Sequence, residues 1–309
     1  MFLNIAVAAL QQGLCYGLVA LGVFISYKIL NFPDLSVDST FPLGALVCVL
    51  CVNKLRINPA AAILIAGIAG AAAGSVTGLL HVKLGISDLL SGILVMTALL
   101  SVNLIASRLI DGSPKIIISY GKTIFGGIMP KIFPGSAYKF GVLALLLAIL
   151  IIGKIAIDLF LKTKMGLTLR ATGQNAQIVT SMGRNAGNYK IAGLAMANAM
   201  VSMGGAVYSQ WTRYFDNQSG QGMVVIALAS VIIGCAVFSA LPIVKGTTAV
   251  IVGAVIYGIC IYLAGFFFSS DYLKLIMATL FGIVLIINDR LKREKTQKKA
   301  EAKKNEISA

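Results

Sequence analysis

The chain has 309 residues, of which 58% are hydrophobic and only 12% carry a charge. Its mean hydropathy of +0.90 excludes an ordinary soluble domain of this size. Several apolar runs reach the roughly 20 residues that a membrane-spanning helix needs. Because no stretch of soluble-domain composition interrupts them, the sequence predicts an all-α polytopic membrane domain over residues 1–289, followed by a basic tail at 290–309.

The titratable residues are too few and too scattered for most enzyme chemistry. All glutamates lie in the tail, at Glu294, Glu301 and Glu306, and His81 is the single histidine. Most aspartates lie at the ends of apolar runs or in interruptions. We therefore expect no catalytic residues and no metal site. The net charge of +15 comes largely from the tail and the membrane-flanking loops, so it does not indicate a nucleic-acid partner.

In chain order, apolar runs alternate with polar interruptions, which predicts eight or nine transmembrane or partly re-entrant helices. The runs cover approximately residues 2–30, 41–52, 59–80, 86–106, 140–161, 191–208, 223–238, 247–268 and 272–287. The first run opens without a basic residue and lacks a cleavage motif, which favours a retained helix over a signal peptide. Gly70, Gly74 and Gly78, at four-residue spacing in the third run, predict close packing against another helix.

A polar break at residues 31–40 follows the first run. Pro33 ends a helix, and the apolar run after the break is too short to span a bilayer alone. Interrupted helices line the substrate sites of many transporters, although a plain loop between two helices is an equally good interpretation. A similar break at 215–220 precedes the short seventh run, so the two halves are compatible with inverted repeats. These breaks supply the candidate residues of a substrate path: Asn31, Asp34, Asp38, Asp216 and Asn217.

A long polar stretch, Thr163 to Tyr189, carries three cationic side chains and no carboxylate. Its backbone groups would be unpaired in hydrocarbon, so it must lie in water on one face of the membrane. Asn175 can cap a short helix that runs to about Met182 and ends at Gly183. Such a helix is too polar for a deep membrane anchor and suits a groove on a soluble partner. The alternative is a basic loop that only fixes the topology.

The charge distribution sets the expected orientation. Eight of the fifteen residues 290–304 are Lys or Arg, so the positive-inside rule places the tail in the cytoplasm. Counting four crossings back puts residues 162–190 on the same side, and five more crossings put the N-terminus outside. By the same count the basic region Arg108 to Lys139 falls outside, against the rule, which is acceptable because long loops obey it poorly. If the 41–52 run were re-entrant, the N-terminus would instead lie inside.

The central stretch resembles the cytoplasmic loop of ABC importer permeases of the branched-chain amino acid and ribose type. The pattern in this chain is Gly166-x3-Arg170-Ala171-x3-Asn175-x7-Gly183-x-Asn185. The resemblance extends from the early break and Leu43-Gly44 to the Gly-Gln-Gly-Met sequence at 220–223. It is strongest to permeases assigned to tryptophan/tyrosine uptake. Val179 departs from the family, which often has Ala there, and so does Arg184, where an apolar residue is common.

The resemblance implies a type II-like importer permease in which this stretch forms the coupling helix, seated in a cleft of a cytosolic ATPase. The residues implied in coupling are Gly166, Arg170, Ala171, Asn175, Val179, Met182, Gly183 and Arg184. Two permease copies and two ATPases would form the importer in the bacterial plasma (inner) membrane. An extracytoplasmic substrate-binding protein would deliver a small solute; the resemblance implies an amino acid, with the aromatic amino acids among the candidates. This chain would bind no cofactor, since ATP and Mg²⁺ belong to the partner ATPase; it has no GxxxxGK[ST] loop.

Two other kinds of membrane protein remain alternatives to an importer permease. An ion-coupled secondary transporter needs carboxylates within the membrane, and the absence of glutamate before the tail argues against it. A channel for small solutes is harder to distinguish by sequence, and conductance without an ATPase would support it.

Overall fold

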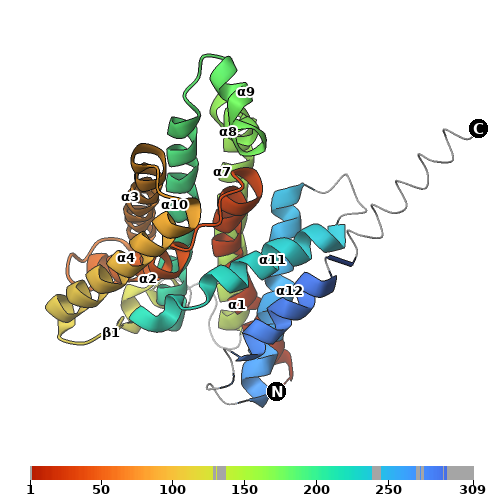
Figure 1. Ribbon diagram of the computed structural model, residues 1–309. Helices are drawn as coiled ribbons and strands as arrows, with labels where there is room; N and C mark the ends of the chain where they lie inside the picture. The colour runs from red at the N-terminus through yellow and green to blue at the C-terminus, as the bar shows by residue number, and fades with distance from the viewer. Residues whose placement is uncertain are drawn as a thin grey trace, which may run out of the picture.

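The computed structural model describes residues 2–127, 130, 137–238, 245–268, 272, 275–287 and 289–290. Over these residues the chain is almost entirely helical and contains one two-stranded sheet. Figure 1 shows the long helices gathered in a bundle, with α8 and α9 projecting at one end and the N-terminus at the other. The basic tail predicted at 290–309 lies outside the described residues, apart from Arg290.

The longer elements are α1 (Phe2–Val23), the π-helix η1 (Phe24–Ile29), α2 (Val37–Asn53), α3 (Pro59–Leu84), α4 (Asp88–Asp111), α7 (Tyr138–Lys162), α8 (Lys164–Gln174), α9 (Ala176–Ser181), α10 (Ala186–Thr212), α11 (Met223–Val237) and α12 (Gly246–Phe267). Seven helical segments of the described chain are long and apolar enough to cross a bilayer, and α2 and Leu275–Ile287 are shorter apolar helices. The prediction of an all-α polytopic membrane protein is therefore confirmed.

Helix α10 lies at the centre of the bundle and contacts α1, α2 and α3. Its approach to α3 is close because Gly70, Gly74 and Gly78 face it. A methyl group added at Gly74 would collide with the carbonyl oxygen of Leu194, and one added at Gly78 would press on the backbone of Ile191. Between membrane helices, where apolar burial gains little, such backbone proximity supplies the van der Waals attraction. The close packing predicted from the glycine spacing is confirmed.

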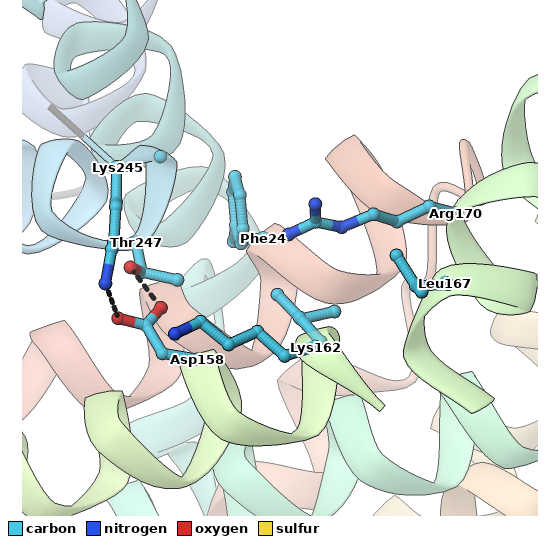
Figure 2. Close-up of a pocket in the computed structure, with 9 residues that line it drawn as sticks. Phe24, Asp158, Lys162, Leu167, Arg170, Lys245 and Thr247 are labelled. Atoms are coloured by element: carbon cyan, nitrogen blue, oxygen red, sulfur yellow. Dashed lines mark hydrogen bonds and ion pairs between the residues drawn. The ribbon is translucent and has the colours of Figure 1, made fainter. Parts of the chain in front are cut away.

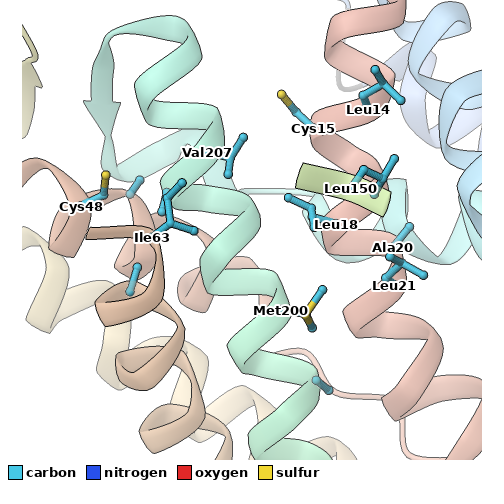
Figure 3. Packing of buried hydrophobic residues seen from close by; sticks show 14 of the residues in the cluster. Leu14, Cys15, Leu18, Ala20, Leu21, Cys48, Ile63, Leu150, Met200 and Val207 are labelled. Carbon is cyan, nitrogen blue, oxygen red and sulfur yellow. The ribbon is translucent and has the colours of Figure 1, made fainter. Parts of the chain in front are cut away.

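On its other side, α10 packs against α1 and α7 through an apolar core. Leu18 and Leu21 of α1, Leu150 of α7 and Met200 of α10 are buried in the same cluster (Figure 3). In contrast, the large apolar side chains on the outer faces of α3, α4 and α7 are exposed, as helices that face lipid require. Examples are Ile68, Ile105 and Ile152.

The break after α1 is present and has an irregular geometry. The helix ends in the π-helical turn η1, and Asn31 adopts a left-handed conformation with φ 54°. The chain then enters the bundle before α2 begins at Val37. Most of α2 is buried, and it contacts α3, α4 and α10. No feature singled out in the sequence predicted the π-helical turn, and π-helical turns are frequent at functional sites.

The break and α2 together complete one passage through the bundle. At its C-terminal end, the side-chain amide of Asn53 donates to the carbonyl oxygen of Ile117, 2.9 Å away. That carbonyl belongs to β1 (Lys115–Ile117), which pairs antiparallel with β2 (Tyr214–Asp216) just after α10. The β-ribbon that β1 and β2 form lies at the end of the bundle opposite α8 and α9 (Figure 1). The loop 110–138 forms β1 and the short helix α5 (Ile124–Gly127), and the strand was not predicted.

The close contact between α3 and α10 gives a testable stability prediction. Replacement Gly74→Ala should lower the unfolding free energy by about 1–3 kcal/mol, because the added methyl group overpacks the interface with Leu194. Alanine is otherwise the better helix former, so a loss of stability cannot come from helix propensity. Thermal unfolding of the detergent-purified protein measures the change. The control is Gly282→Ala, where an added methyl group meets nothing within 4 Å; equal melting temperatures for the two variants would contradict the packing account.

Candidate functional site

The polar stretch between α7 and α10 folds as a helical hairpin of α8 and α9. The hydroxyl of Thr163 accepts a hydrogen bond from the backbone N–H of Gly166 at 3.2 Å and so caps α8. The Oδ1 atom of Asn175 accepts from the N–H of Gln177 at 2.9 Å and caps α9. Gly183, with φ 71°, lies just past the end of α9. The predicted helix from Asn175 to about Met182 is confirmed, whereas α8 was not predicted.

Helix α8 is anchored to the bundle through its buried face. Leu169 is fully buried and touches the region of Gly193 in α10. Gly173 lies so close to the end of η1 that an added methyl group would collide with the carbonyl oxygen of Ile29. A displacement of α8 must therefore push on the π-helical end of α1 and on the start of α10.

Helix α9, in contrast, presents apolar side chains to the outside at the tip of the hairpin. Ile178 is 52% exposed and Met182 is 72% exposed, while Val179 between them is buried. Arg184 follows the tip, where its guanidinium donates to the hydroxyl of Tyr189 at 3.1 Å. Figure 1 shows α9 at the extreme end of the molecule. An apolar tip surrounded by polar and cationic groups is typical of a surface that docks into a protein groove.

A hollow of about 550 Å³ lies beside the tip, between the start of α8 and the start of α10. Lys164, Met165 and Arg184 are among the residues that line it. The stretch from 163 to 189 contains no carboxylate. The hollow therefore combines a cationic rim with an apolar side chain, and its charge is complementary to an acidic protein surface.

The eight predicted coupling residues lie in three places: at the exposed tip, in the buried part of the hairpin, and in a pocket beside it. Asn175, Met182, Gly183 and Arg184 are exposed around the tip. Gly166 and Val179 are buried and Ala171 is half-buried, so these three support the hairpin. Arg170 is exposed, but Figure 2 shows its side chain directed toward Phe24, in a pocket between the hairpin and α12. Arg170 therefore does not join the tip.

Asp34, a predicted path residue, is 5% exposed and lies inside the bundle. Asn198 donates to Asp34 Oδ2 at 2.7 Å, and the backbone N–H of Ser36 donates to Oδ1 at 2.9 Å. Asn198 lies near the middle of α10, a 27-residue helix, so Asp34 sits deep within the membrane-spanning part. Most aspartates lie at the ends of apolar runs or in interruptions of the sequence, and Asp34 shows that such an interruption can itself lie in the interior. Its hydrogen bonds to Asn198 and Ser36 hold the break in place within the bundle.

Asp38 joins the two breaks of the chain. Its carboxylate accepts from the N–H of Gly222 at 3.1 Å and from that of Val224 at 2.8 Å, and so holds the start of α11. Asn217, on the second break, donates to the carbonyl oxygen of Leu100 at 3.4 Å, and its own Oδ1 is buried without a hydrogen-bond partner. A methyl group added at Gly220, in the second break, would collide with the carbonyl oxygen of Asp38, in the first, so the two breaks that resembled each other in sequence lie in contact.

The remaining path candidates lie at opposite ends of the bundle. Asn31 lines a pocket of about 300 Å³ together with Lys28 and Gly173, next to α8. Asp216 pairs with Lys115 at 3.1 Å on the β-ribbon. The five candidates thus mark a series of positions across the bundle and do not converge on one cavity.

Two amides that were not among the predicted path residues complete the buried polar network. Asn198 binds Asp34, and Asn103 of α4 donates to the carbonyl oxygen of Ser39 at 3.0 Å. The Oδ1 atom of Asn103 is buried without a hydrogen-bond partner. Each is an amide within an apolar helix, which is the sequence signal that could have identified them. Within the described ranges, no group of three His, Cys, Asp or Glu side chains could hold a metal ion.

Comparison with known proteins agrees with this architecture. The family described as "Branched-chain amino acid transport system / permease component" matches residues 5–287. The chain is 40% identical over 273 residues to the tyrosine transport system permease protein of Clostridioides difficile (strain R20291), covering 88% of this chain and 87% of that protein. No solved structure matches it at a significant level.

Two further relatives are more distant. An uncharacterized protein of Rickettsia prowazekii (strain Madrid E) is 30% identical over 236 residues, 76% of this chain and 79% of that protein. The guanosine ABC transporter permease protein NupQ of Bacillus subtilis (strain 168) is 28% identical over 180 residues, 54% of this chain and 55% of that protein. The chain belongs to the family of permease components of branched-chain amino acid transport systems.

Proposed function

We propose that this permease takes its energy from a separate cytosolic ATPase that grips the α8–α9 hairpin, and that its substrate is an aromatic amino acid. As a member of this family the chain is a transport subunit of an ABC importer and not an enzyme. The observation that carries the coupling proposal is the tip of the hairpin, where Ile178 and Met182 are exposed beyond the spanning helices.

The chemistry of the tip suits a groove on a soluble protein. Exposed Ile178 and Met182 gain free energy when a partner removes them from water, at about 25 cal/mol for each Å² of apolar surface buried. Lys164 and Arg184 beside them can pair with carboxylates on the rim of that groove. ATP and Mg²⁺ would be held by the partner.

Transmission of ATPase movement would run through α8. Its Gly173 abuts the carbonyl oxygen of Ile29, and Leu169 packs at Gly193. A pull or push on the hairpin therefore reaches the π-helical end of α1, and through the break it reaches Asp34 in the bundle. In this proposal the substrate path includes Asn31, Asp34 and Asp38 on the first break and Asp216 and Asn217 on the second, with alternating access controlled at the breaks.

The proposed assembly is a pair of permeases with two ATPases in the bacterial plasma membrane, with the substrate path along the interface of the pair. The hairpin and the tail would face the cytoplasm, and the N-terminus and the β-ribbon would face outward. The cationic residues at the hairpin end, such as Lys28, Lys83 and Lys162, support this orientation under the positive-inside rule. A substrate-binding protein would then dock on the outward end, near Lys115 and Arg213. The tyrosine transport permease of Clostridioides difficile supports an aromatic substrate.

Loss of the apolar tip should strongly weaken ATPase binding. In the double variant Ile178→Ser with Met182→Ser, we expect affinity for the ATPase to fall at least about thirtyfold, since one buried hot-spot side chain contributes about 2 kcal/mol. The measurement is capture from solubilised membranes, with the captured ATPase identified by its GxxxxGK[ST] loop. Ile117→Ser, an exposed isoleucine on the opposite end, is the matched control. Undiminished capture by the double variant would refute docking at the tip.

A second prediction concerns transmission. Gly173→Ala should leave the ATPase bound, because Gly173 is not at the tip, but should reduce the stimulation of ATP hydrolysis by substrate-loaded binding protein about fivefold or more, the usual size of a coupling energy. The added methyl group would displace α8 from Ile29. ATPase assays on the reconstituted complex measure this effect, with Gly121→Ala as the control because nothing lies within 4 Å of an added methyl group there. Normal stimulation in Gly173→Ala would show that α8 does not transmit through η1.

A further inference from the structure

A pocket of about 390 Å³ opens at the hairpin end of the bundle, beneath α8. Figure 2 shows its walls, formed by the end of α7, the start of α12, α8 and Phe24 of η1. Lys162, Arg170 and Lys245 supply cationic groups, and Asp158 is the one carboxylate among the described residues that line it. The pocket is separate from the tip of the hairpin and from both breaks.

The single carboxylate of this pocket is already fully engaged. Lys154 Nζ donates to Asp158 Oδ2 at 3.0 Å, Lys245 Nζ lies 3.6 Å from the same oxygen, and Thr247 donates to Oδ1 at 2.7 Å. The contacts from Lys245 and Thr247 hold α7 to the start of α12. The three contacts also mean that Asp158 is shared by two lysines and leaves the pocket with an excess of positive charge.

Lys162 and Arg170 are the cations without an acidic partner in the described part of the pocket. Figure 2 shows the side chains of both extending into the space from α7 and α8. Residues 239–244, which precede Lys245, contain no charged side chain. The unbalanced charge therefore faces the interior of the pocket and attracts an anion.

The depth of the pocket and its apolar wall indicate what kind of anion fits. It lies where α7 ends at Lys162 and α12 begins at Gly246, at the level that lipid headgroups occupy next to spanning helices. Phe24, Leu161 and Leu167 line it beside the cations. Gly246 and Thr247 at the start of α12 add backbone N–H groups to the lining, since the N-cap residue Lys245 makes no side-chain cap. A cationic pocket between helices at this level suits a phosphate that carries an apolar group.

We propose that this pocket binds the phosphate of an anionic phospholipid headgroup, held by Lys162 and Arg170, with the glycerol and upper acyl region against Phe24 and Leu167. The bound lipid would fill the space between α8 and α12, which both pack against α7. Binding needs no ATPase and no substrate, so the proposal stands independently of the coupling mechanism.

Native mass spectrometry of the purified permease, in nanodiscs of phosphatidylcholine with or without phosphatidylglycerol, tests the proposal. We expect wild type to retain phosphatidylglycerol in preference to phosphatidylcholine after release from the disc. Each cation removed should weaken retention about fivefold, so Lys162→Gln with Arg170→Gln should weaken it about twenty-five-fold. Lys164→Gln is the matched control, since Lys164 lies two positions from Lys162 on the same connection but does not line this pocket. Circular dichroism checks that each variant keeps its helical content.

Three results would overturn the proposal. The first is equal retention of phosphatidylglycerol by wild type and the double variant. The second is an equal loss in the Lys164→Gln control, which would indicate a general surface-charge effect. The third is displacement of the retained lipid by millimolar inorganic phosphate, which would assign the pocket to a soluble phosphate anion. A folded double variant that loses the lipid, with phosphate unable to compete in wild type, would establish the site.

Discussion

The hydrogen bond between Asp34 and Asn198 keeps a non-helical stretch of chain inside a membrane-spanning bundle. Backbone groups that leave a helix at this depth have no water to bind, so the break between η1 and α2 can exist only where protein groups satisfy it. Asn198 and the N–H of Ser36 bind the Asp34 carboxylate. The close packing of α10 against α3 keeps Asn198 in position. A buried carboxylate could also suggest ion coupling, but both oxygens of this one are engaged in the fold.

The chain around the Asp34–Asn198 hydrogen bond is packed in the interior of the bundle, whereas the α8–α9 hairpin at one end is exposed. The break is continuous with η1, η1 touches Gly173 of α8, and α8 carries the apolar tip of α9. A continuous set of close contacts thus joins the outermost surface to the middle of the bundle. Asp38 of α2 binds the start of α11 in the second half of the chain. A movement of one break is therefore expected to move the other.

Much of the fold could be predicted because apolar length, glycine spacing and helix caps are local signals. Such signals predicted the nine apolar segments, the close packing of α3 on α10 at Gly74 and the cap at Asn175. The π-helical turn, α8 and the partnership of Asp34 with Asn198 could not be predicted in the same way. They depend on contacts between residues far apart in the chain, such as that between Gly173 and Ile29. Arg170 illustrates the limit for the site, because its motif position suggested the coupling surface while its side chain points toward Phe24 (Figure 2).

The most direct test of the account is the energy source of transport. The permease would be reconstituted in proteoliposomes with its ATPase and binding protein, and uptake of radiolabelled L-tyrosine would be followed. The account predicts uptake that requires ATP on the hairpin side, stops with a hydrolysis-deficient ATPase and persists when ionophores collapse all ion gradients. Uptake by the permease alone, driven by an ion gradient and abolished by ionophores, would contradict it.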